Sequence, residues 1–305
     1  QSSSQSFPGT VDYRTQIYTF GETPLRRIVP SLTRELKQHV GNKEVFAAEP
    51  LRVQSYRGLV RRIAQLAYIN EDYLLFFRGQ SKDFKNRAGS STIYPAIYRG
   101  EYVRYREIYR RFQILEEGCR LLKNAFEAQK ITGYQALVRK RYIQWSMLQH
   151  YGVCETPLLD LTHSVRVASS FAQHSTEGGF AYVFVFGLPY MTNRISINSE
   201  DNLVNVRLLS ISPPDALRPY FQEGYLAGTT DITTEYDSKT ELDFRNRLIA
   251  KFEIPSGASF WGKGFASIPE EVLFPAHDEV KALCKSIAST LVTWDQPEDL
   301  GSFIR

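Results

Sequence analysis

The chain has 305 residues, of which 43% are hydrophobic and 13% aromatic, and this size and composition suit one large buried core or two modest ones. The net charge of +4 is too small to indicate nucleic-acid binding without a concentrated basic patch. The three cysteines show no metal-ligand spacing, which disfavours a structural zinc site and a disulfide framework. No stretch approaches the ~20 apolar residues of a membrane span, and the first residues lack a signal pattern. We therefore expect a cytoplasmic protein that holds no metal and does not act at a membrane.

Residues 1–50 are expected to form a polar, serine-rich tail and then an extension with one short helix at 32–40. Apolar residues at helical spacing predict a helix over 53–69, which leads directly into a strand at 73–77. A long amphipathic helix is predicted over 103–128, because one apolar stripe recurs there every three or four residues. A second helix follows it. We expect this helical pair to be inserted between the first strand and the rest of the sheet.

Strand patterns dominate the second half of the chain. The run FAYVFVF at 180–186 is the strongest of them, because β-branched and aromatic residues crowd it. Further strands are expected at 158–161, 203–208, 225–228, 248–254 and 272–274. A helix capped by Ser164 and a C-terminal helix from Ala276 complete the order of elements. These elements predict an α+β fold with a mixed, mostly antiparallel sheet in one domain at 51–295, followed by a short tail at 296–305.

The run YLLFFRGQ carries the most informative side chain of the sequence. A strand that ends on Arg78 and Gly79 places a fixed cation beside an exposed backbone, which suits a phosphate group. The planar guanidinium can donate two parallel N–H bonds to a pyrophosphate, a geometry that lysine cannot copy. Gly79 would let a ligand approach the backbone closely.

Five short segments together resemble the FRG domain family, which is named for the tripeptide Phe77-Arg78-Gly79. They are FRGQ (77–80), YPAIYR (94–99), QHYG (149–152), TPLLDLTHSVRVASSFA (156–172) and YFQEG (220–224). The resemblance covers residues 51–295 loosely and these five motifs closely. Leu161 departs from the family pattern, which commonly has a tryptophan at that place.

The order of these motifs is also similar to the plan of the mono-ADP-ribosyltransferases, which implies an ADP-ribosyltransferase-like sheet. In that plan an arginine followed by glycine matches Arg78, a hydroxyl motif matches Thr162 with Ser164, and a glutamate before an aliphatic strand matches Glu271. Such a carboxylate faces the positive charge that develops when the nicotinamide–ribose bond breaks. Pro269 departs from the glutamate that the superfamily has two residues before its catalytic one.

The resemblance implies an NAD-dependent transfer of ADP-ribose to a protein or nucleic-acid acceptor, of toxin or defence type, or else hydrolysis of NAD. The implied catalytic residues are Glu271, Arg78 and Ser164. The residues implied to bind NAD are Arg78, Gly79, Gln80, His150, Thr162, Ser164 and Gln222. No metal is implied.

Several alternatives stay open at this point. Glu107, on the long helix, rivals Glu271 as the functional carboxylate, and Arg78 is alternatively a structural partner of a carboxylate such as Asp160. Ser164 is equally an ordinary helix cap, and His150 a core histidine. The chain is alternatively a non-catalytic module that binds a nucleotide or a protein. An active site requires the strands 73–77 and 158–161 to be neighbours in one sheet.

Overall fold

The computed structural model describes residues 25–100, 103–174, 176, 178–230 and 239–294. The expected tails at 1–10 and 296–305 lie outside these residues. Within the described part of the chain, no helix is both long enough and apolar enough to cross a membrane.

One sheet of eight strands, in the order β1-β8-β4-β2-β3-β7-β6-β5, forms the centre of the described structure. The strands are β1 (Leu51–Arg52), β2 (Leu74–Gln80), β3 (Leu159–Thr162), β4 (Phe180–Leu188), β5 (Ile195–Asn198), β6 (Leu203–Arg207), β7 (Gly224–Thr229) and β8 (Leu248–Pro255). Strand β1 runs parallel to β8, and every other neighbouring pair is antiparallel. The predicted α+β class and mixed, mostly antiparallel sheet are therefore confirmed.

Most helices lie where the apolar spacing predicts them. The α-helices are α2 (Arg34–Val40), α3 (Tyr56–Ile69), α4 (Tyr105–Gln129), α5 (Tyr134–Arg139), α6 (Arg141–His150), α7 (Val165–His174), α8 (Arg218–Phe221), α9 (Ala258–Trp261), α10 (Glu270–Leu273) and α11 (Glu279–Trp294). Short 3-10 helices are η1 (Ala96–Tyr98), η2 (Leu208–Ser210), η3 (Lys239–Leu242) and η4 (Phe244–Arg247). The second predicted helix is divided into α5 and α6, because Lys140 between them is extended. Helices α4 to α6 are inserted in sequence between β2 and β3.

Two local predictions are wrong. No strand forms at the expected positions 272–274: Val272 and Leu273 are the last residues of helix α10, and Phe274 follows it. The helix starts after Pro269 and has two glutamates in its first turn, where they interact favourably with the helix dipole. The first strand also does not stop before Arg78. Strand β2 continues to Gln80, and its last three residues pair with Phe184, Val183 and Tyr182 of β4.

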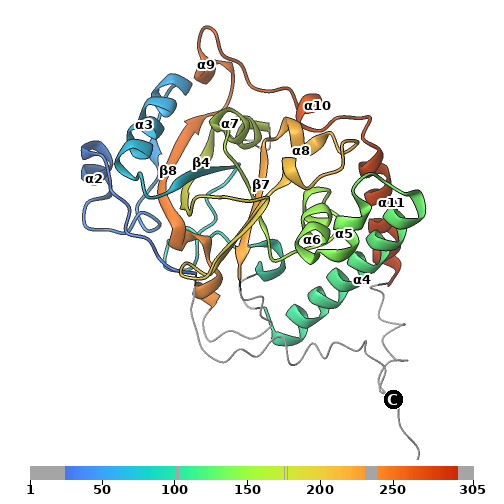
Figure 1. Ribbon diagram of the computed structural model, residues 1–305. Helices are drawn as coiled ribbons and strands as arrows, with labels where there is room; N and C mark the ends of the chain where they lie inside the picture. Colours follow the sequence, from blue (N-terminus) through green and yellow to red (C-terminus); the bar gives the residue numbers. More distant parts are fainter. Residues whose placement is uncertain (1–24, 101–102, 175, 177, 231–238, 295–305) are drawn as a thin grey trace, which may run out of the picture.

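Alternate residues of β2 contribute to cores on opposite faces of the sheet. Phe77 packs with side chains of α3, α7 and α9, whereas Phe76 packs on the other face with Leu25 and Val45 of the N-terminal segment. Helices α4, α6 and α11 pack against β6 and β7. Figure 1 shows these helices gathered at one side of the sheet, with α2 and α3 at the other. Because Leu25, Ile28 and Leu36 are buried in these cores, the extension before β1 is part of the packed fold.

Candidate functional site

Three of the motif segments meet at Asp160 on β3. Arg78 donates from Nη1 to the carbonyl oxygen of Asp160 at 2.7 Å, and Gln149, near the end of α6, donates from Nε2 to its Oδ2 at 2.7 Å. Thr156 in turn donates from Oγ1 to Oε1 of Gln149 at 2.6 Å. The pair Phe77–Thr162 joins β2 to β3, which confirms that the two predicted strands are neighbours. We call Arg78, Gln149, His150, Asp160 and Arg218 the Asp160 cluster.

The alternative interpretation expected a carboxylate partner for Arg78, but within the described residues its hydrogen bond goes to a backbone carbonyl and it forms no ion pair. Burial lowers the pKa of its guanidinium to about 10, against the opposing effect of the nearby Asp160 charge. Its Nε is buried and has no hydrogen-bond partner among the described residues. A cation whose Nε is buried and unpaired is a costly arrangement in the absence of a further acceptor.

Arg218, the first residue of α8, is the second cation of the cluster. Burial lowers the pKa of its guanidinium, and the charges of Asp160 and Asp278 oppose that effect. The guanidinium lies over the ring of Phe274, 4.7 Å from its centre, and its Nε is buried with no partner in the described part of the chain. The sequence interpretation missed Arg218, although it stands two residues before the YFQEG motif.

His150 is 3% exposed and completes the cluster at the C-terminal end of α6. Its pKa lies well below the usual value, first because the ring is buried and second because Arg218 is near. The ring is therefore neutral, and its Nε2 has no partner among the residues described. Tyr151, which follows it, donates to both oxygens of Asp278, and Asp278 also accepts from the backbone N–H of Arg218 at 3.2 Å. Asp278 thus holds the start of α8 in place.

The hydroxyl motif is engaged within the protein. Thr162 donates from Oγ1 to the carbonyl of Gln222 at 3.0 Å and accepts from the N–H of Ser164 at 3.0 Å. Ser164 accepts from the N–H of Val167 at 3.3 Å and so caps α7. Gln222 donates from Nε2 to the carbonyl of Leu273 at 2.8 Å. These bonds hold α7, α8 and α10 beside the sheet.

Gly79 and Gln80 end strand β2 in different surroundings. A Cβ atom on Gly79 would lie 1.8 Å from the carbonyl oxygen of Ala168. The glycine therefore lets α7 pack directly on β2, and the space expected for a ligand on that side is filled by this helix. The side chain of Arg78 leaves the strand on the opposite face, so the sheet separates it from Ser164. Gln80 has a buried Oε1 without a partner among the described residues.

The two glutamates weighed from the sequence lie outside the cluster. Glu271 is exposed on α10, in a helix rather than before a strand, and it forms no hydrogen bond or ion pair within the described residues. Glu107 forms an ion pair with Nε of Arg111 at 3.1 Å, and Glu155 contacts the same nitrogen at 3.1 Å. The carboxylate of Asp160, by contrast, accepts a hydrogen bond from the motif residue Gln149.

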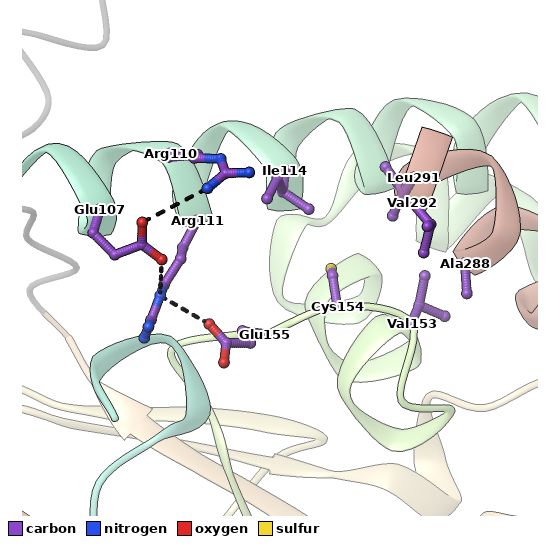
Figure 2. Close-up of a pocket in the computed structure, with 10 residues that line it drawn as sticks. All are labelled: Glu107, Arg110, Arg111, Ile114, Val153, Cys154, Glu155, Ala288, Leu291 and Val292. Atoms are coloured by element: carbon purple, nitrogen blue, oxygen red, sulfur yellow. Dashed lines mark hydrogen bonds and ion pairs between the residues drawn. The ribbon is translucent and has the colours of Figure 1, made fainter. Parts of the chain in front are cut away.

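Glu107 lines a pocket of about 300 Å³ between α4, α11 and the segment after α6 (Figure 2). Figure 2 shows Arg111 between the carboxylates of Glu107 and Glu155 at one end, and Ile114, Leu291 and Val292 at the other. No member of the Asp160 cluster lines this pocket. Glu107 is thus placed in a separate hollow of the molecule.

Comparison with protein families identifies residues 74–178 as an FRG domain. The matched segment starts at β2 and ends after α7, so it contains Arg78, Gln149, His150 and Asp160 but not Arg218. Searches of curated proteins and of solved structures return no significant match. The FRG resemblance is therefore confirmed for this segment.

Proposed function

We propose that the Asp160 cluster binds the phosphate groups of a nucleotide, with NAD as the ligand to test first. One observation carries the proposal: Arg78 bonds the backbone of Asp160, the charge of Asp160 acts on both Arg78 and Arg218, and each of these half-buried arginines has a buried Nε without a partner among the described residues. Arginine is the residue best suited to bidentate recognition of phosphate. An anion accepting from these donors would remove the penalty of leaving them unpaired.

Neutral His150 and Gln149 support the same function. A neutral imidazole with an unpaired Nε2 suits a hydrogen bond with a ribose hydroxyl, and this contact does not add charge to a site that already holds two cations. Gln149 keeps the carboxylate of Asp160 oriented through a 2.7 Å bond to Oδ2. The cluster thus combines donors for phosphate with neutral groups for a sugar.

Transfer of ADP-ribose from NAD is the second candidate function, and the position of Asp160 favours it. Gln149 occupies Oδ2 of this carboxylate, and Oδ1 has no hydrogen bond within the described residues. A carboxylate near a bound ribose stabilises the positive charge that develops when the glycosidic bond breaks. In this proposal Asp160 takes the role that the sequence assigned to Glu271.

Thermal unfolding with NAD, ADP-ribose and AMP tests the binding function. Each ligand that binds the folded protein raises the midpoint, by an amount equivalent to about 2.7 kcal/mol at a hundredfold excess over Kd. Arg78→Lys and Arg218→Lys should lose most of that rise, whereas Arg120→Lys, an exposed arginine paired with Glu117, should keep it. Binding that survives both cluster substitutions would contradict the proposal.

Release of nicotinamide tests the second candidate separately. Asp160→Asn keeps the shape of the side chain but removes its charge, so it should reduce release by a factor of about 100 or more while NAD still raises the midpoint. Glu271→Gln and Glu107→Gln should release nicotinamide as the wild type does. If the wild type binds NAD but releases none with protein or nucleic-acid acceptors, the non-catalytic binding function remains.

A further inference from the structure

An exposed apolar patch lies on α8 and α10. Four side chains form it, and each is between 37% and 45% exposed: Leu217, Tyr220, Phe221 and Val272. The bond from Gln222 to the carbonyl of Leu273 and the stacking of Arg218 on Phe274 hold the two helices together. Figure 1 shows α10 at the upper edge of the molecule with α8 below it. Large exposed side chains gathered on one surface mark an interaction site more often than scattered ones do.

Acidic residues lie within two positions of the patch residues in the sequence. They are Asp215, Glu223, Glu270 and Glu271, and all four are exposed. The basic residue within 215–223 and 269–273 is Arg218, whose guanidinium is turned inward over Phe274. Lys281 of α11 donates to the carbonyl of Pro275. The exposed charges on these two segments are therefore acidic, on a chain whose net charge is +4.

From this combination we infer that α8 and α10 form a docking surface for a basic protein segment that carries aromatic or aliphatic side chains. Opposite charges at the rim of an interface steer association and select the partner, and exposed tyrosine and phenylalanine supply the contact area at its centre. An acidic partner would meet four like charges. The inference does not depend on the proposed nucleotide site, although Arg218 links the two.

Fluorescence anisotropy with a labelled peptide of alternating lysine and leucine tests this surface. Wild-type protein should bind the peptide, and binding should weaken as salt rises. Glu270→Lys with Glu271→Lys should weaken it by about tenfold or more, and Tyr220→Ser with Phe221→Ser should do so without changing charge. The control is Tyr68→Ser with Glu71→Lys, an exposed aromatic and acidic pair on and just after α3, which should leave affinity unchanged.

Three outcomes would overturn the inference. They are absence of binding by the wild type, equal weakening by the control pair, and self-association of the wild type that Glu270→Lys with Glu271→Lys abolishes. The last outcome would assign the surface to a second copy of the chain. Circular dichroism of each variant checks that it is folded. Binding of an acidic peptide of alternating glutamate and leucine by Glu270→Lys with Glu271→Lys, but not by the wild type, would further support the inference.

Discussion

Burial changes what the charged residues of the Asp160 cluster can do. The guanidinium of Arg78 bonds a carbonyl rather than a carboxylate, so the negative charge of Asp160 is not consumed by a direct ion pair with it. Taking a guanidinium out of water lowers its pKa, yet at about 10 Arg78 is still charged near neutral pH. The site therefore keeps a fixed cation that is partly removed from water.

His150 should make the stability of the protein fall in mild acid. Its folded pKa lies well below the usual value because the ring is buried near Arg218. As the pH drops below about 6.5, the ordinary histidine value, the unfolded chain binds a proton that the folded chain does not. The free energy of unfolding then decreases by up to about 1.4 kcal/mol per pH unit, until the folded pKa is reached.

The measurement is urea denaturation of wild type and His150→Gln at several pH values between neutral and mildly acidic. As the pH falls, the free energy of unfolding should decrease more for the wild type than for His150→Gln. His277→Gln changes an exposed histidine and should follow the wild type. Parallel pH profiles of His150→Gln and wild type would show that His150 takes up its proton equally in both states.

At the scale of elements, the contact between α7 and β2 depends on the absence of a side chain. Helix α7 lies so close to Gly79 that the carbonyl of Ala168 and the N–H of Ala172 occupy the space of a Cβ atom. Backbone atoms cannot rotate away as a side chain can. The helix and the strand that together carry the hydroxyl and arginine motifs are thus fixed in relation to each other.

Gly79→Ala should therefore lower the free energy of unfolding by about 3 kcal/mol or more, because one of the two backbones has to move. Gly179→Ala is the matched control, since no other group lies within 4 Å of the position of its Cβ, and it should change stability by less than about 0.5 kcal/mol. Chemical denaturation of both variants makes the comparison. A similar small effect for both would mean that α7 shifts without strain.

At the scale of the whole molecule, Lys251 of β8 joins segments that are far apart in the sequence. It is buried, and its Nζ donates to Oδ2 of Asp83 at 3.2 Å, to Oγ of Ser91 at 2.5 Å and to the carbonyl of Phe46 at 3.3 Å. Arg78 of β2 pairs with Phe184 of β4, which in turn pairs with Lys251. Lys251 therefore lies on the same face of the sheet as Arg78. The N-terminal segment and the loop after β2 are thereby held over that face.

Lys251→Met should destabilise the protein by about 3–5 kcal/mol, because it leaves the buried carboxylate of Asp83 without its cation. The double variant Lys251→Met with Asp83→Leu should recover most of that loss, since it removes both charges. Thermal and urea unfolding of the two variants measure the difference. A single variant as stable as the wild type would show that water replaces the lysine at Asp83.

Local patterns predicted many elements and failed where tertiary contacts decide. Helix α4 buries one face along its length, and strand β4 buries residues on both of its faces. Both elements are long enough for the spacing of their apolar residues to identify them. The segment 272–274 is too short for its apolar spacing to distinguish a strand from a helix. Its composition is typical of a strand, but the chain forms a helix that starts after Pro269 and buries Leu273. The end of β2 was missed because its pairing partner, β4, lies about a hundred residues further along the chain.

Residue patterns were enough to predict the fold class, the order of most elements and the motifs that resemble an FRG domain. The meeting of Arg78, Gln149 and Asp160, the addition of Arg218, and the exclusion of Glu271 and Glu107 became visible in the folded chain. Periodicity depends on near neighbours in the chain, whereas a site depends on strand order and on which buried donors lack acceptors. Those relations join residues that are close in space and distant in sequence.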